Sequence, residues 1–87
     1  MSSMRLISGS KGVRALSSLP SGTRGTIQRV QAQDRDRADR LVALGVTTGA
    51  PVTVLQTFPG IVFLCDQTEL AVERAVADTI LVKLAEG

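Results

Sequence analysis

Few side chains in this 87-residue sequence could perform acid–base, nucleophilic or metal chemistry. It contains no histidine, the commonest general base and metal ligand, and its single cysteine, Cys65, cannot form a thiolate cluster. Neither a Ser–His nor a Cys–His nucleophilic pair can be assembled. The stretch Gly22-Thr23-Arg24-Gly25 lacks the Gly-Lys-Ser/Thr sequence of a phosphate-binding loop. We therefore predict no catalytic site and no cofactor site, and we expect a protein that is not an enzyme.

Three closely spaced aspartates, Asp34, Asp36 and Asp39, raise the question of a carboxylate metal site. They alternate with arginines, and the further oxygen ligands of a calcium-binding loop do not follow them. Acids in this position are more typical of a helix start, where they cap free N–H groups and oppose the helix dipole. Cys65 ends an apolar stretch and is interpreted as a small core side chain. No metal site is predicted.

Five arginines within one third of the chain suggest nucleic-acid binding as an alternative function: Arg24, Arg29, Arg35, Arg37 and Arg40. The formal net charge is only +2, however, and neither Tyr nor Trp is present to stack on bases. The two phenylalanines, Phe58 and Phe63, lie in or beside apolar strands, which favours packing in the core over base stacking. We therefore expect no nucleic-acid partner.

Length and composition indicate one small domain. Apolar residues make up 44% of the chain and only two are aromatic, so the core must be built from Val, Leu, Ile and Ala. A single cysteine fits a reducing compartment, and the cytoplasm is expected. No apolar run approaches the roughly 20 residues of a membrane span, so contact with a membrane would come only through a partner. Positions 1–12, rich in Ser and Gly, are predicted to form a flexible N-terminal extension, and residues 13–87 the folded domain.

Alternating apolar residues and turn signals predict five short strands, over residues 26–31, 51–57, 61–65, 69–72 and 79–84, with a single helical turn at 74–78. Four glycines are predicted at structural turns: Gly22, Gly25, Gly45 and Gly49. Such a chain fits an all-β fold with one short helix. We predict a small SH3-like barrel of about five strands, because closure of a barrel removes exposed sheet edges.

The one substantial helix is predicted over residues 34–45. Asp34 or Asp36 can cap its start, and Gly45 occupies the position at which a left-handed residue ends many helices. Val46 can then pack on Leu41. The helical period places four residues on one face: Ala38, Leu41, Val42 and Gly45.

Three blocks of this sequence have a recognisable pattern. They are Leu-Pro-Ser-Gly-Thr-Arg-Gly-Thr-Ile at 19–27, Arg-Leu-Val-Ala-Leu-Gly-Val-Thr-Thr-Gly at 40–49, and a third block running from Glu-Leu-Ala-Val at 69–72 to Ile-Leu-Val at 80–82. In these blocks the chain resembles the FeoA family, small cytoplasmic SH3-like proteins of bacterial ferrous-iron uptake. The resemblance extends from about Leu16 to Leu84, and the middle block is its most specific part.

The resemblance implies an accessory or regulatory protein of the FeoB transporter, a membrane protein whose cytoplasmic part carries a GTPase domain. Docking onto that cytoplasmic part is the expected mode of action. The family is related in fold to the C-terminal domain of DtxR-type metalloregulators, which leaves metal-dependent regulation, with transition-metal sensing, as an alternative. The predicted partner-binding surface combines the helix and its exit with the turn between the middle strands: Arg37, Arg40, Leu44, Val46, Thr47, Phe58 and Pro59.

Overall fold

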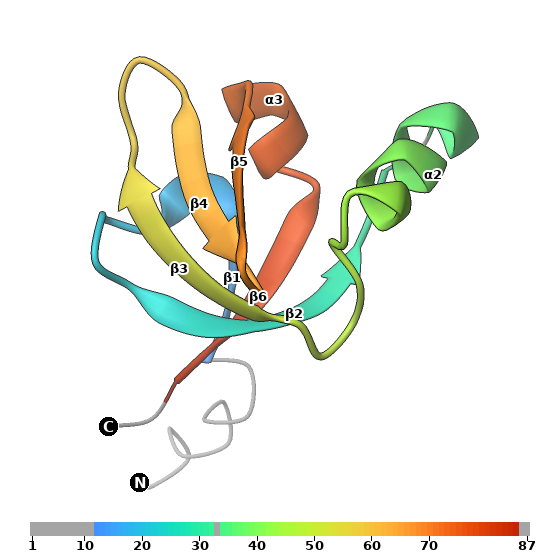
Figure 1. The fold of residues 1–87 in the computed structure, drawn as a ribbon. Helices are drawn as coiled ribbons and strands as arrows, with labels where there is room; N and C mark the ends of the chain where they lie inside the picture. Colours follow the sequence, from blue (N-terminus) through green and yellow to red (C-terminus); the bar gives the residue numbers. More distant parts are fainter. Residues whose placement is uncertain (1–11, 33, 86–87) are drawn as a thin grey trace, which may run out of the picture.

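Antiparallel strands in the order β1-β6-β2-β3-β4-β5 form one curved sheet in the computed structural model, which describes residues 12–32 and 34–85 (Figure 1). The elements in chain order are β1 (Val13–Ala15), the 3-10 turn η2 (Leu16–Ser18), β2 (Arg24–Val30), α2 (Arg35–Ala43), β3 (Pro51–Gln56), β4 (Ile61–Cys65), β5 (Thr68–Val72), α3 (Arg74–Ala77) and β6 (Ile80–Leu84). Strands β2 to β5 form a meander, and β6 returns to pair with β2. The predicted all-β class with one short helix is confirmed.

Each of the five predicted strands is present, with ends within about two residues of those expected. The sixth strand, β1, was not predicted. It has only three residues and follows a stretch rich in Gly and Ser, and it becomes a strand by pairing with β6, where Arg14 lies opposite Val82. The flexible extension predicted for positions 1–12 lies, apart from Gly12, outside the described residues.

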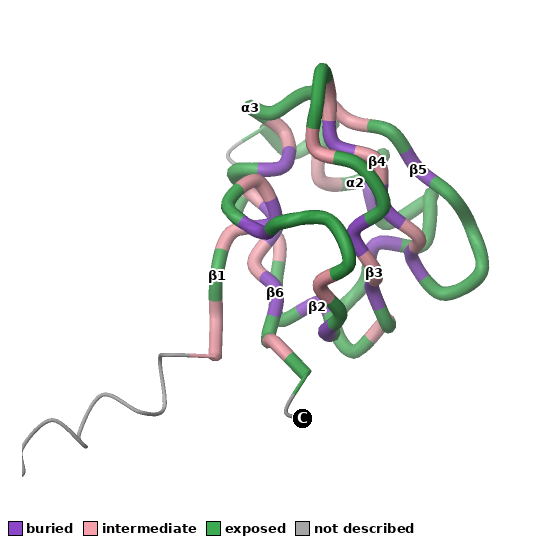
Figure 2. The backbone as a smooth tube through the Cα atoms, turned by 90° about the vertical axis from the view of Figure 1, so that its left-hand side faces the viewer, coloured by how far each residue is buried: buried purple, intermediate pink, exposed green. Residues whose placement is uncertain are grey.

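The core lies inside the curve of the sheet. Strand β4 shows why: Ile61, Phe63 and Cys65 are buried, whereas the two residues between them are partly exposed. Buried positions also alternate with more exposed ones in parts of β2, β3 and β6 (Figure 2). Among the described residues no polar or charged side chain is buried. The remaining buried hydrophobic side chains are Leu16, Leu19, Ile27, Leu41, Val46, Val52, Val54, Leu70, Ala77, Ile80 and Val82.

Gly25 has a different role from the turn that was predicted for it. It lies within β2, is buried, and is paired with Leu84 of β6. A Cβ atom at this position would overlap the carbonyl oxygen of Lys83 and lie 2.8 Å from Cγ1 of Val82. Glycine is therefore needed here for the close approach of β2 and β6. The other three predicted turn glycines, Gly22, Gly45 and Gly49, all have positive φ.

Helix α2 is defined at both ends by its own sequence. The Asp34 carboxylate accepts a hydrogen bond of 2.9 Å from the Asp36 N–H and caps the start. At the end, Gly45 has φ +99°, its N–H donates to the Val42 carbonyl, and the Val46 N–H donates to the Leu41 carbonyl. These two hydrogen bonds make the Schellman motif that was expected at Gly45 and Val46.

The side chains of α2 pack less than its pattern suggested. Leu41 is its one buried residue, and Val42, expected on the same face, is 55% exposed. Figure 1 shows the reason, since α2 stands to one side of the sheet and does not lie flat across it. The helix therefore meets the barrel along a narrow stripe, and a groove runs beside that contact.

Candidate partner-binding site

The predicted partner-binding residues fall into three structural groups. Arg37, Arg40 and Leu44 line a groove beside α2, and Thr47 is exposed in the loop that follows the helix. Phe58 and Pro59 lie in the loop between β3 and β4, joined by a cis peptide bond. Val46 is fully buried, so it anchors the end of α2 in the core and cannot contact a partner in this structure.

The groove lies between α2 on one side and the end of β5 with the start of α3 on the other. Its volume is about 310 Å³. Helix α2 and its C-cap residue contribute positions i, i+3, i+4 and i+7, which share one face of a helix: Arg37, Arg40, Leu41 and Leu44. The opposite wall consists of Ala71, Val72, Glu73 and Val76. Sequence reasoning missed this second wall, because it is brought to α2 only by the path of the sheet.

The charges of the groove are mainly positive. Arg37 and Arg40 line it from α2, and Glu73 is the one acid among its lining residues. None of the side-chain hydrogen bonds between described residues uses the guanidinium of Arg37 or Arg40, whereas Arg74 makes two. The acid Asp39 of α2 lines a separate hollow with Arg35. Helix α2 thus presents two arginines and two leucines to the groove.

The loop between β3 and β4 forms a second, separate surface. Phe58 at its tip is 81% exposed, so the interpretation that both phenylalanines pack in the core holds for Phe63 and is wrong for Phe58. The Arg74 guanidinium ties this loop to the barrel by donating to the carbonyl oxygens of Thr57, at 2.7 Å, and Ser17, at 3.1 Å. Figure 1 shows α3 between this loop and α2. The two parts of the predicted surface therefore do not form one site.

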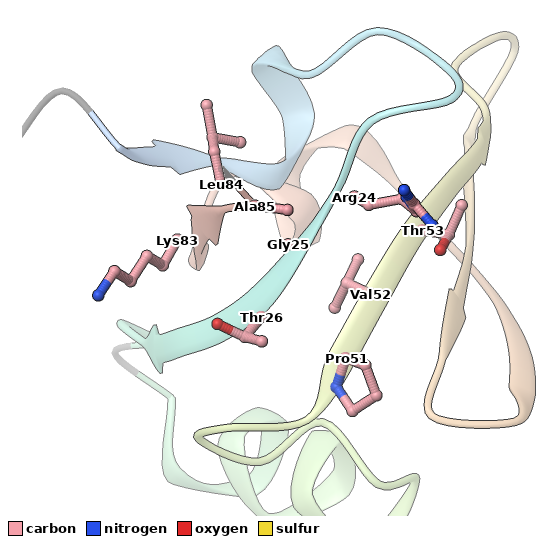
Figure 3. A pocket seen from close by; sticks show the side chains of 9 residues that line it. All are labelled: Arg24, Gly25, Thr26, Pro51, Val52, Thr53, Lys83, Leu84 and Ala85. Atoms are coloured by element: carbon pink, nitrogen blue, oxygen red, sulfur yellow. The ribbon is translucent and has the colours of Figure 1, made fainter. Parts of the chain in front are cut away.

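A larger hollow of about 650 Å³ lies where β2, β3 and β6 meet, near Gly25. It is a broad, open depression. Its two cations, Arg24 and Lys83, extend to opposite sides of it (Figure 3). The two cations could not both contact one small ligand in this hollow, so we propose no binding site there.

The titratable groups of the described chain do not form a reactive cluster. No three His, Cys, Asp or Glu residues within ranges 12–32 and 34–85 are placed to share a metal ion. Burial raises the pKa of the Cys65 thiol, and the negative charge of Asp66 raises it further. The thiol also donates to the Gly45 carbonyl, at 3.4 Å. Cys65 is thus held as a neutral core side chain at the exit of α2.

Comparison with known proteins shows the family of this chain. The FeoA domain family matches residues 14–84. This chain belongs to the FeoA family. The match includes all three sequence blocks and the whole region, from about Leu16 to Leu84, in which the resemblance was recognised. No individually curated protein matches the sequence of this FeoA-family chain.

Solved structures place the FeoA-family chain among small barrels. The solution structure of FeoA from Chlorobium tepidum is 33% identical, with a TM-score of 0.71, over 82% of this chain and 70% of the other. The zinc complex of Stenotrophomonas maltophilia FeoA is 24% identical, with a TM-score of 0.70, over 78% of this chain and 87% of the other. That protein is described as an SH3 domain protein, which confirms the predicted SH3-like fold.

The same barrel occurs within a larger protein. A manganese-dependent transcriptional repressor superposes with a TM-score of 0.78 at 21% identity, over 84% of this chain and 42% of the repressor. At this identity the likeness shows the fold alone. Within the part of the chain that the structure describes, no helix is long and apolar enough to cross a membrane.

Proposed function

We propose that this FeoA-family protein is a non-enzymatic accessory protein of ferrous-iron uptake that docks onto the cytoplasmic part of a FeoB-type transporter. The observation that carries the proposal is the FeoA match over residues 14–84. The S. maltophilia relative has been put forward as a ferrous iron transport activating factor, which supports an accessory role. The protein would then act in the cytoplasm and reach the membrane only through the transporter.

The surface of the barrel supports docking. Leu44 lines the groove and is 45% exposed, and Phe58 projects from the β3–β4 loop. Exposed apolar side chains beside charged ones are typical of interfaces, where aromatic residues and arginines contribute most of the binding energy. The docking residues that we propose are Arg37, Arg40, Leu44, Thr47, Phe58 and Pro59, with Val46 fixing the end of α2 from within the core.

Association with the cognate FeoB-type transporter in detergent tests this function directly. We expect the tagged full-length protein to retain the transporter on a column and the Leu44→Ser variant to retain less. Val42→Ser is the matched control, because Val42 is more exposed than Leu44 on the same helix but does not line the groove. If the wild-type protein retains no transporter, the proposed function is wrong.

Metal-dependent regulation is the second candidate, and the likeness to the manganese-dependent repressor is the observation that favours it. It requires binding of a metal ion or of a nucleic acid. Anaerobic calorimetry with Mn²⁺ and Fe²⁺, and DNA titrations at several salt concentrations, would reveal either activity. Heat of metal binding or steeply salt-dependent DNA binding, without association with the transporter, would replace the first proposal by this one.

A further inference from the structure

Strand β5 has one open edge, because it is the last strand in the sheet order and pairs only with β4. The turn between β4 and β5 has two residues, Asp66 and Gln67, which makes Cys65 and Thr68 the first hydrogen-bonded pair of the hairpin. Hydrogen-bonded and non-hydrogen-bonded pairs then alternate along the ladder. The N–H and C=O groups of Glu69 and Ala71 therefore point away from β4, towards the open edge.

These outward groups have no backbone partner among the described residues. The inter-element backbone hydrogen bonds within ranges 12–32 and 34–85 do not use the N–H of Glu69 or of Ala71. An edge strand with unpaired donors and acceptors can pair with another extended chain. The edge of β5 at Ala71 is therefore free to accept a further strand.

The groove beside α2 reaches this edge at the end of β5. Ala71 and Val72 both line it, although neighbouring residues of a strand point to opposite faces of the sheet. A groove that contacts both meets β5 where the edge and the end of the strand come together. In Figure 1, β4 lies on one side of β5 and α2 on the other. The groove therefore has the outward-facing residue Ala71 on one wall and the arginines and leucines at α2 on the other.

We propose that this groove binds an extended, acidic segment of the transporter's cytoplasmic part, which adds to β5 as a further antiparallel or parallel strand. This proposal rests on the proposed function. The backbone of β5 supplies hydrogen bonds to the added strand, and Leu41 and Leu44 cover one row of its side chains. Arg37 and Arg40 select acidic residues, since the lining contains two cations and one acid. We name this surface the β5-edge groove.

Charge reversal tests the acidic character of the bound segment. Binding of the full-length protein to the purified transporter would be measured for wild type, Arg37→Glu and Arg35→Glu. The two variants change the same charge on the same helix two residues apart, but Arg35 lines the separate hollow beside Asp39. We expect Arg37→Glu to weaken binding roughly tenfold or more, and Arg35→Glu to bind like wild type. Equal losses in both would overturn the proposal.

Backbone pairing is tested at Ala71. Ala71→Pro removes an outward N–H without removing a hydrogen bond to β4, and proline is tolerated at such edge positions. Ala71→Ser keeps the N–H and a side chain of similar size. We expect the proline variant to lose binding about as strongly as Arg37→Glu and the serine variant to retain it. A circular dichroism spectrum and melting curve establish that each variant folds.

Amide hydrogen exchange locates the contact independently of any variant. Addition of the transporter should slow exchange at Glu69 and Ala71, whose N–H groups point outward, with little change at Leu70 and Val72, which already pair with β4. The transporter could also bind without protecting Glu69 and Ala71, and bind Arg37→Glu as well as wild type. That result would overturn the β5-edge groove as the binding site and leave the proposed function intact. Absence of all binding would overturn both.

Discussion

The close approach of β2 and β6 at Gly25 yields the sharpest prediction of stability. In Gly25→Ala the added Cβ would overlap the Lys83 carbonyl oxygen, which belongs to the backbone and cannot rotate away. The two strands must therefore separate, and the pairs formed by Gly25 with Leu84 and by Thr26 with Lys83 are disturbed. Because β6 also holds β1, the damage reaches three neighbouring strands.

The expected cost follows from two opposing effects. Overpacking a close contact costs about 1–3 kcal/mol, and each disturbed backbone hydrogen bond adds about 1 kcal/mol. Alanine restricts the unfolded chain more than glycine does, which returns about 0.4–1 kcal/mol. We expect Gly25→Ala to lower the free energy of unfolding by about 2–3 kcal/mol, which for a domain of this size lowers Tm by roughly 10–20 °C.

Two other glycines serve as controls in the same urea and thermal unfolding assay. A Cβ at Gly12 meets nothing within 4 Å, so Gly12→Ala should change stability by less than about 1 kcal/mol. Gly45 also has open space but a positive φ, so Gly45→Ala should cost about 1–2 kcal/mol through backbone strain alone. If Gly25→Ala proves as stable as Gly12→Ala, the close packing of β2 on β6 is refuted.

Urea denaturation should show that the two phenylalanines contribute very differently to stability. Phe63 is fully buried, so Phe63→Ala should lower the free energy of unfolding by about 3–5 kcal/mol. Phe58 is 81% exposed, so Phe58→Ala should lower it by less than about 0.5 kcal/mol. Asp34→Ala removes the cap of α2 and should cost about 1 kcal/mol, visible as faster amide exchange in its first turn. Cys65 should react with iodoacetamide far more slowly than an unfolded thiol, since its pKa is raised. Because the Cys65 pKa is raised, the thiol stays protonated in the folded state at pH values at which it ionises in the unfolded state. The free energy of unfolding should therefore fall as pH rises past the ordinary thiol pKa, and a urea midpoint that does not change over this pH range would contradict the prediction.

The parts of the fold that sequence predicted well depend on neighbouring residues. The break at residues 58–60 and the polar turn after Cys65 gave the bounds of β4 without error, and the cap at Asp34 with the exit at Gly45 located the two ends of α2. These features are set by contacts within a few positions along the chain. Strand β1 is different, because three residues contain no period long enough to recognise, and its partner β6 lies far away in sequence.

The candidate site was predicted in part for the same reason. Arg37, Arg40 and Leu44 were found from one helix, but the wall formed by Ala71 and Val72 depends on where β5 passes α2. Gly25 was predicted at a turn because it lies close after the turn residue Gly22. Only the register of β2 with β6 shows that a side chain at position 25 would not fit between the two strands. Long-range register is the information that single-sequence patterns lack.

The weak attachment of α2 explains how the β5-edge groove can exist at all. A nine-residue helix is too short to be stable alone, and this one buries only Leu41 of its own residues. Its direction is therefore set mainly by the Schellman exit and by Val46, which is fully buried just beyond it. A helix held at one end need not close over the neighbouring strand, so the edge of β5 stays uncovered and Leu44 stays exposed. A bound segment would supply the packing that α2 lacks, and this gain in apolar burial would favour occupancy of the groove.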